Sequence, residues 1–206
     1  MSDDKSTAET IIRFLEAVEP MKSHTRSAWT AAGKPESVAA HSWRLCMLAI
    51  AIAPHLDGVD TERLVRMCLV HDLGEAIHGD VPAPEQSPDN DRHATEQATV
   101  AGLAALLGGT AGEQMLDLWN DYSDGETAEA VVAKALDKIE TIAQHNQGAN
   151  PDDFDYRFNL EYGRNIPLSS ALIRALRERV DHKTAELADR ADRAAELSDR
   201  AARGDR

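Results

Sequence analysis

The chain of 206 residues carries 22 basic and 36 acidic side chains, which leaves a formal net charge of -14. A chain of this length fits one domain whose core is large enough to be stable unaided. Its negative charge argues against a general binder of nucleic acid polymers or of anionic membranes. No apolar run approaches the roughly 20 residues of a membrane span, and the N-terminal residues lack the basic and apolar regions of a signal peptide, so we expect a cytoplasmic protein.

Helical periodicity dominates the first part of the chain. Aromatic residues make up only 4% of the sequence, and no stretch alternates as a half-buried strand does, so we predict an all-α fold. A first short helix is predicted over residues 10–18, where Pro20 closes it. Residues 21–35 carry Gly and Pro without clear periodicity. Ser37 is typical of an N-cap, and it predicts a helix that runs towards Ala53.

The remaining elements follow at helical spacing. Thr61 is expected to cap a central, mostly buried helix that continues to about Ile77, and a loop rich in Pro and Asp covers Gly79 to Asn90. The further helices are predicted over residues 91–107, 111–121, 126–147 and 168–180. Gly108 and Gly109 divide the first two of these helices.

The C-terminal segment differs in composition from the rest of the chain. Residues 181–206 hold seven acidic and six basic side chains in an imperfect repeat of Ala, Asp, Arg and Glu, so the negative charge resides in the body of the protein. We assign residues 1–182 to one domain and residues 183–206 to a charged extension, either helical or disordered, that carries no chemistry. Cys46 and Cys68 each lie in an apolar helical pattern, which favours buried reduced thiols over a disulfide or a zinc site.

The adjacent pair His71-Asp72 is the most informative feature for function. Together with His41 and Asp137, which lie in other predicted helices, it offers two imidazoles and two carboxylates. Such a set can hold one divalent cation and leave coordination positions for water and substrate. We therefore predict a metal-dependent hydrolase.

A structural role for each of these residues must be weighed against the metal site. A lone histidine such as His41 is usually a hydrogen-bonded structural residue. A carboxylate inside an apolar helix costs several kcal/mol unless it is paired, so Asp72 and Asp137 need a partner. Arg44, Arg66 or Lys134 could supply it through an internal salt bridge, and spacing alone does not decide between the two interpretations.

Two further carboxylates strengthen the functional interpretation. Glu75 shares a helix face with His71 and Asp72, and Asp80 lies in the loop just beyond that face. Acids crowded in this way repel one another unless cations offset them. An exposed helix position remains the alternative for Glu75. Near the N-terminus, Arg26 could bind phosphate oxygens, and Trp29 could pack against a sugar or a base.

In combination, these segments resemble a known family. The order of motifs is similar to that of the HD-domain phosphohydrolases, and within them to the small 5'-deoxynucleotidase group that includes bacterial YfbR-like proteins and eukaryotic HD-domain-containing protein 2. The resemblance covers roughly residues 8–180. The segments that carry it are Arg26 to Trp29, Glu36 to His41, Leu69 to Glu75, Gly79 to Pro82, and Ala135 to Lys138.

The resemblance implies a fold, a cofactor and a reaction. The fold would be a helical HD-domain bundle with a buried mononuclear metal site, and the reaction would release phosphate from deoxyribonucleoside 5'-monophosphates. Manganese or cobalt is the favoured metal, with magnesium, zinc, nickel or iron as further options. Family members are usually homodimers, which we expect here too. The ligands implied are His41, His71, Asp72 and Asp137.

The resemblance also implies roles around the metal. Glu75 and Asp80 match the catalytic acids, Arg26 matches the phosphate-binding arginine, and Trp29 matches a tryptophan that disfavours a 2'-hydroxyl. The residues agree with this chemistry, because a cation held by imidazoles and carboxylates lowers the pKa of bound water, which would attack phosphorus in line. Glu75 or Asp80 would orient or deprotonate that water, and the sequence does not assign acid and base between them.

This chain departs from the family pattern at a few positions. Ala28 stands where glycine is common before the tryptophan, which puts sugar discrimination in doubt. His78 replaces a smaller polar residue, and we treat it as a candidate substrate-binding residue that contacts phosphate, approaches the metal or faces solvent. Basic residues are sparse over residues 81–100, so the second wall of the substrate pocket is not identifiable.

Three other functions remain as alternatives. A di-iron oxygenase or a cyclic-dinucleotide hydrolase of the HD type would need more histidines, for which His78, His93 and His145 are available at spacings that do not match. A related hydrolase class acts on nucleoside triphosphates or other phosphoesters. A non-catalytic regulator that binds a nucleotide or a protein is disfavoured because every ligand and both acids are present. Base preference is not readable from the sequence.

Overall fold

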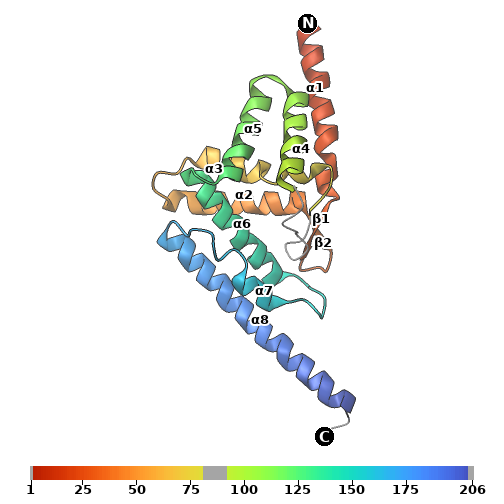
Figure 1. Ribbon diagram of the computed structural model, residues 1–206, viewed down its shortest axis with the longest axis vertical. Helices are drawn as coiled ribbons and strands as arrows, with labels where there is room; N and C mark the ends of the chain where they lie inside the picture. The colour runs from red at the N-terminus through yellow and green to blue at the C-terminus, as the bar shows by residue number, and fades with distance from the viewer. Residues whose placement is uncertain (1, 81–91, 204–206) are drawn as a thin grey trace.

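The computed structural model describes residues 2–80 and 92–203 (Figure 1). Helices form almost all of its regular structure, as predicted. The elements in chain order are α1 (Ser2–Val18), the 3-10 turn η1 (Glu19–Lys22), β1 (Thr25–Trp29), β2 (Pro35–Ser37), α2 (Val38–Ile52), η2 (Ala53–His55), α3 (Thr61–Val70), η3 (Leu73–Ala76), α4 (Arg92–Leu107), α5 (Gly109–Asp124), α6 (Ala128–Gln147), α7 (Tyr156–Glu161) and α8 (Ala171–Arg203).

The core lies where α2, α3 and α6 meet. α6 occupies the centre of the bundle and packs against α2, α3, α5 and α8 (Figure 1). Its apolar stripe includes Leu136 and Ile139, which are buried, and Leu45 of α2 and Leu64 of α3 belong to the same cluster. Burial of these side chains stabilises the fold at roughly 25 cal/mol per Å² of apolar surface, and it fixes the three helices that carry the polar residues described below.

Helix starts follow the predicted chemistry with one shift. Ser37 caps α2 as expected, since its side chain accepts a hydrogen bond from the backbone N–H of Ala40 at 3.2 Å. The cap of α3 is Asp60 rather than Thr61, because the Asp60 carboxylate accepts from the backbone N–H of Arg63. The prediction that Thr61 caps this helix was therefore wrong by one residue.

The predicted helix through Ile77 is interrupted. α3 ends at Val70, His71 and Asp72 form a turn, and η3 follows. The interruption lets η3 pack closely on α4, where a Cβ on Gly74 would lie 2.5 Å from Cβ of Glu96. Glu75 therefore lies on a 3-10 turn, and the prediction that it shares an α-helical face with His71 and Asp72 was wrong.

A short hairpin forms in the segment without periodicity. β1 and β2 are antiparallel, with Thr25 opposite Ser37 and Trp29 opposite Pro35. Gly33 turns the chain with a φ of 74°, a conformation that favours glycine. The pattern was too short and too irregular to predict as strands. Its consequence is that β1 lies against α6 and brings Arg26 to the centre of the molecule.

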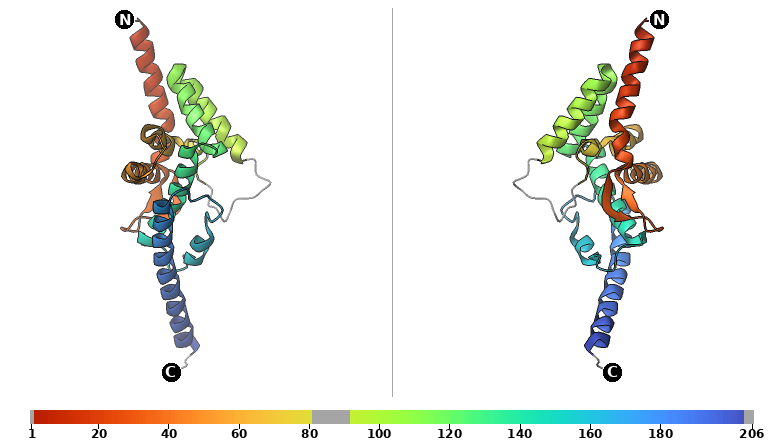
Figure 2. Two further views of the ribbon diagram at one scale, coloured as in Figure 1. Left: turned by 90° about the vertical axis from the view of Figure 1, so that its left-hand side faces the viewer. Right: turned by 90° about the vertical axis from the view of Figure 1, so that its right-hand side faces the viewer.

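The α4–α5 pair confirms the two helices predicted around Gly108 and Gly109, although α5 starts at Gly109 and runs to Asp124 instead of covering 111–121. The two helices approach so closely that a Cβ on Gly112 would lie 2.2 Å from the carbonyl oxygen of Ala104. With α1, this pair projects from one end of the molecule, whereas α8 extends from the other (Figure 2). Most of the predicted loop, residues 81–90, lies outside the described residues.

The C-terminal region contains a helix that the sequence did not reveal and one that is longer than predicted. α7 was not foreseen, and α8 continues from Ala171 to Arg203 without a break. The boundary that we placed between residues 182 and 183 falls inside α8 and stays a prediction. Cys46 and Cys68 are buried free thiols, as expected. In the described part of the chain, no helix is both long and apolar enough to cross a membrane.

Candidate metal centre and active site

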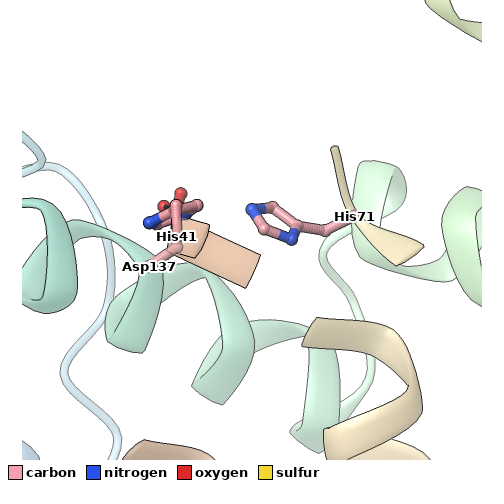
Figure 3. Close-up of side chains that lie close together, drawn as sticks. All are labelled: His41, His71 and Asp137. Atoms are coloured by element: carbon pink, nitrogen blue, oxygen red, sulfur yellow. Dashed lines mark ion pairs between the residues drawn. The ribbon is translucent and has the colours of Figure 1, made fainter. Parts of the chain in front are cut away.

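The four predicted ligands meet although they come from three parts of the fold. His41 lies in α2, Asp137 lies in α6, and His71 and Asp72 form the turn after α3. Nε2 of His41 is 3.2 Å from Oδ1 of Asp137 and 3.8 Å from Oδ2 of Asp72, and Nε2 of His71 is 3.1 Å from Oδ1 of Asp72. Figure 3 shows the ring of His71 pointing toward His41 and Asp137.

Each imidazole is held in the orientation that a metal ligand needs. Nδ1–H of His71 donates to the carbonyl oxygen of Cys68 at 2.9 Å, and Nδ1–H of His41 donates to Oε2 of Glu140 at 2.5 Å. Both Nε2 atoms are buried, and neither has a hydrogen-bond partner among the residues that the structure describes. Two unpaired Nε2 atoms that face carboxylate oxygens are the donor set expected of a divalent cation site, with the outer hydrogen bonds fixing the tautomers.

The electrostatics of His41 show how strongly this position attracts positive charge. Burial and then the charge of Arg26 lower the pKa of His41, but the neighbouring carboxylates of Asp137 and Glu140 more than offset them and raise it to about 9. A site that favours a proton to this extent also favours a cation in its place.

The two carboxylates of the site stay ionised because cations surround them. Burial alone would raise the pKa of Asp137, but Lys138 and the two histidines hold it well below its usual range. Nζ of Lys138 lies 2.9 Å from Oδ2 of Asp137, and the hydroxyl of Tyr122 donates to the same oxygen at 3.1 Å. For Asp72, burial is likewise outweighed, by His71 and then Arg26, and the pKa falls below its usual range.

None of the salt bridges that we had considered for these acids is formed within the described structure. Arg44 pairs with Glu140 at 3.2 Å, Arg66 pairs with Glu62, and Lys134 donates to the carbonyl oxygen of Ser123. The partners are instead Arg26 and Lys138, which themselves lie at the site. The pairing of Asp72 and Asp137 is therefore part of the site and does not offer a separate structural explanation for them.

A cavity of about 740 Å³ opens over these groups. Arg26 lines it, and its guanidinium donates to Oδ2 of Asp72 at 3.2 Å and to Oγ1 of Thr141 at 3.0 Å. Burial lowers the pKa of Arg26, but the neighbouring carboxylates, first Asp72 and then Asp137, outweigh this effect and raise the pKa above its usual value. The guanidinium therefore keeps its charge. The cavity thus holds a fixed positive charge beside the four candidate ligands, which suits a bound phosphate.

Glu75 and Asp80 line the same cavity and share a cation that the sequence did not single out. Nη2 of Arg92 lies 2.8 Å from Oε1 of Glu75 and 3.7 Å from Oδ1 of Asp80. Burial, followed by the charges of Asp72 and Asp80, raises the pKa of Glu75 well above its usual range despite this contact. Oε2 of Glu75 is buried and has no hydrogen-bond partner in the described ranges, so a proton on that oxygen is available to the cavity.

The structure does not bring every candidate to the cavity. His78 is exposed and lies beside α4, in a separate hollow. The indole of Trp29 does not line the cavity either, although it packs edge-on against Phe154, which does, at a centroid distance of 6.2 Å. Arg26, Ser27 and Ala28 of the same strand form the wall at this point. The exposure of His78 agrees with the solvent-facing alternative, and a contact of His78 with phosphate stays a prediction.

Sequence reasoning missed several residues of the site. The most important is Glu140, which is buried and holds His41. A signal for it existed, because α6 buries polar residues at positions i, i+3, i+4 and i+7, namely Asp137, Glu140, Thr141 and Gln144. No comparable pattern marks Arg92, which is the first residue of α4.

The additional histidines do not form a second ligand group with the first in the described structure. His93 stacks on Trp119 at a centroid distance of 5.6 Å and contacts Ser123, and Nδ1–H of His145 donates to Oδ1 of Asn159 at 3.0 Å. The other buried group of potential ligands, Glu36 with His41 and Glu140, shares His41 with the first and has the guanidinium of Arg44 beside it. The arrangement gives no support to a di-iron centre built on these histidines.

Comparisons with known proteins agree with the geometry. A family model described as HD domain matches residues 18–176. The protein named 5'-deoxynucleotidase HDDC2 of Homo sapiens is 31% identical over 142 residues, which cover 68% of this chain and 69% of that protein. Its namesake in Dictyostelium discoideum is 30% identical over 141 residues, 65% of this chain and 74% of that protein.

Solved structures show the same fold. A structure titled "predicted metal-dependent phosphohydrolase", from Magnetospirillum magnetotacticum MS-1, has a TM-score of 0.65 at 24% identity and covers 92% of this chain and 95% of its own. The PH0347 protein of Pyrococcus horikoshii OT3 has a TM-score of 0.64 at 24% identity, over 84% of this chain and 99% of its own.

Proposed function

Because this chain belongs to the HD domain family, we propose that it is a metal-dependent 5'-deoxynucleotidase that hydrolyses deoxyribonucleoside 5'-monophosphates to deoxynucleosides and phosphate. The observation that carries the proposal is the pair of buried, unpartnered Nε2 atoms beside two carboxylates, with a fixed arginine at the same cavity. The named activity of the relatives at about 30% identity gives the substrate class.

The residues that would hold the cation are His41, His71, Asp72 and Asp137. When bound, a divalent cation lowers the pKa of a coordinated water and polarises a phosphoryl oxygen. We propose manganese or cobalt as the metal, as the family resemblance implies, with magnesium, zinc, nickel and iron as the ions to compare, because imidazole and carboxylate ligands suit several of these ions.

Arg26 would bind the phosphate. Its guanidinium is fixed by Asp72 and Thr141, so little side-chain entropy is lost when it receives a phosphoryl oxygen. A charge-assisted hydrogen bond from this position would hold the substrate and offset the charge that develops on the phosphoryl oxygens.

We assign the proton transfers to Glu75 and Asp80. Because the pKa of Glu75 is raised by burial and by two neighbouring acids, its carboxyl can donate a proton to the departing sugar oxygen. Arg92 holds Oε1 and leaves Oε2 for that transfer. Asp80, which also lines the cavity, would orient the attacking water.

Trp29 would influence the sugar indirectly. Its indole packs edge-on against Phe154, and Phe154 lines the cavity, so Trp29 would shape the wall that a 2'-hydroxyl meets. We propose that selectivity for deoxyribose depends on this pair and does not need a direct contact from the indole.

We also propose a homodimer in the cytoplasm. α2 presents Trp43, Met47 and Ile50, at i, i+4 and i+7, with exposed fractions of 64%, 47% and 49%. An exposed apolar stripe of this kind is typical of a protein–protein contact. The two buried free thiols fit a reducing compartment.

The test is phosphate release from a panel of deoxy- and ribonucleoside 5'-mono- and triphosphates. The metal-stripped protein would be reconstituted separately with manganese, cobalt, magnesium and zinc. Release from deoxymonophosphates alone would support the proposal, and release of pyrophosphate or triphosphate from triphosphates would point to the related hydrolase class. If the metal-loaded protein released phosphate from none of these substrates, the proposal would be overturned.

A further inference from the structure

The far end of the cavity from the candidate metal ligands is built around α7. Along α6, Asp137, Thr141 and His145 follow at i, i+4 and i+8, and all three line the cavity. At a rise of 1.5 Å per residue, this row extends about 12 Å from the metal ligands towards α7. The row passes Thr141, which holds the phosphate-binding Arg26, and ends at His145, which contacts Asn159 of α7.

Asn159 is an unusual residue for a cavity wall because it is 1% exposed and yet incompletely bonded. Its Oδ1 accepts the hydrogen bond from Nδ1–H of His145. Its Nδ2 is buried and has no hydrogen-bond partner within residues 2–80 and 92–203. A buried amide N–H without an acceptor is unfavourable, so the position is expected to have a ligand that supplies one.

The position of Asn159 is fixed by its neighbours. The Asp155 carboxylate caps α7 by accepting from two backbone N–H groups. Nη2 of the buried Arg177 reaches the carbonyl oxygen of Asn159 at 3.4 Å, and its Nη1 donates to that of Tyr162 at 2.8 Å. Because the backbone and Oδ1 are both held, Nδ2 is a preorganised donor.

Aromatic side chains line the same cavity. Phe154 and Phe158 are both lining residues, and Phe158 directly precedes Asn159 in the chain. The ring of Phe154 is fixed by edge contacts with His145 and Tyr156 at centroid distances of 5.0 and 4.9 Å. A planar heterocycle gains contact area against such rings, typically with offset or edge geometry.

We propose that this end of the cavity is a nucleobase subsite, in which Nδ2 of Asn159 donates a hydrogen bond to an acceptor on the base and Phe154 and Phe158 contact its faces. The inference rests on the proposed function, since it places the base of the same substrate whose phosphate meets Arg26. The subsite would extend recognition of the substrate from its phosphate and sugar to its base. Asn159 thus contributes to binding and takes no part in the chemistry.

The experiment compares a nucleotide with its abasic counterpart. The full-length manganese-loaded protein and its variants Asn159→Asp and Asn159→Ala would be assayed on thymidine 5'-monophosphate and on deoxyribose 5-phosphate, which lacks the base. Asn159→Asp keeps the acceptor for His145 and removes the donor. We expect kcat/KM for the nucleotide to fall about 10-fold or more relative to that for the abasic substrate. A uniform loss on both substrates would show a structural role and overturn the proposal.

A matched control uses another asparagine of the same region. Asn150 donates to the carbonyl oxygen of His145 at 2.6 Å and to the hydroxyl of Tyr156 at 2.9 Å, but it does not line the cavity. Asn150→Ala should leave the ratio of the two kcat/KM values unchanged. A change as large as that of the Asn159 variants would contradict the assignment.

Binding to the metal-free protein separates this inference from the proposed function. Calorimetry with thymidine, which has no phosphate, should show about 10-fold weaker binding to Asn159→Asp than to the unmodified chain. This difference is expected even if the protein hydrolyses none of the nucleotides. Equal affinities of the two proteins for thymidine would overturn the base subsite while leaving the nucleotidase proposal intact.

Discussion

Glu140→Gln provides the sharpest test of how the metal site is built. Glu140 and His41 are 2% and 0% exposed, so solvent does not screen the 2.5 Å contact between Oε2 and Nδ1. Glutamine keeps an acceptor for Nδ1–H but removes the charge. A charged hydrogen bond of this kind is worth about 1.5–3 kcal/mol, and loss of an outer-shell partner typically weakens metal affinity by about 10–100-fold.

The assay is a titration of manganese into the chelator-treated protein in competition with a chelating dye. We expect the dissociation constant for manganese to rise by about 10–100-fold in Glu140→Gln, with an unchanged circular dichroism spectrum. Affinity within threefold of the unmodified protein would refute the argument that Glu140 orients and polarises His41.

Glu36→Gln is the matched control. Glu36 is also buried and lies in the same group with His41 and Glu140. Burial and then the charge of Glu140 raise the pKa of Glu36, and no hydrogen bond joins its carboxylate to His41 among the described contacts, so glutamine should disturb His41 less at this position. Manganese affinity should change by less than threefold. An equal loss in both variants would indicate a general effect of mutating this region.

Glu75→Gln should lower kcat for deoxymonophosphates by about 10²–10⁴-fold, because Glu75 is proposed to transfer protons. Manganese affinity in the same dye titration should stay unchanged, because Glu75 is not a proposed ligand. Loss of metal would show that the roles are misassigned. His71→Ala should instead lose most metal binding, since it removes one of the two unpartnered Nε2 atoms, and retained stoichiometric binding would argue against the site. Arg26→Ala should lower kcat/KM by about 10–100-fold through a lost charge-assisted hydrogen bond, and an unchanged value in steady-state kinetics would remove Arg26 from the phosphate site. Chelation should lower the midpoint of thermal unfolding, measured by scanning calorimetry, by about 5–10 °C. The reference is protein with manganese at about 100 times its dissociation constant. Coincident midpoints would mean that no metal stabilises the fold.

Local signals in the sequence predicted the helical elements well, and the exceptions have physical causes. Ser37 as an N-cap and Gly108 and Gly109 between two helices act through neighbouring backbone atoms, so they can be recognised without tertiary structure. The break after Val70 could not be recognised from the sequence, because it depends on the contact of Gly74 with Glu96 of α4. The β1–β2 hairpin escaped prediction because its strands are short and irregular in register.

For the candidate site too, some features could be predicted from the sequence and others could not. Residue types and motif order were enough to name His41, His71, Asp72 and Asp137, since few arrangements other than a cation site bury such a set. The positions of Trp29 and His78 depended on the direction of side chains in a hairpin and a turn. Sequence spacing does not specify that direction outside regular helices.

The sequence by itself determined the helical class, the family resemblance and the identities of the candidate ligands, because these depend on residue types and short-range spacing. Only the tertiary structure decided which partners hold those residues. Glu140 behind His41, Arg92 beside Glu75 and the unpartnered Nδ2 of Asn159 all result from contacts between distant helices. Such contacts arise from the packing of whole elements, and the carboxylates, amides and guanidinium groups of one chain can pair in many ways until that packing selects one.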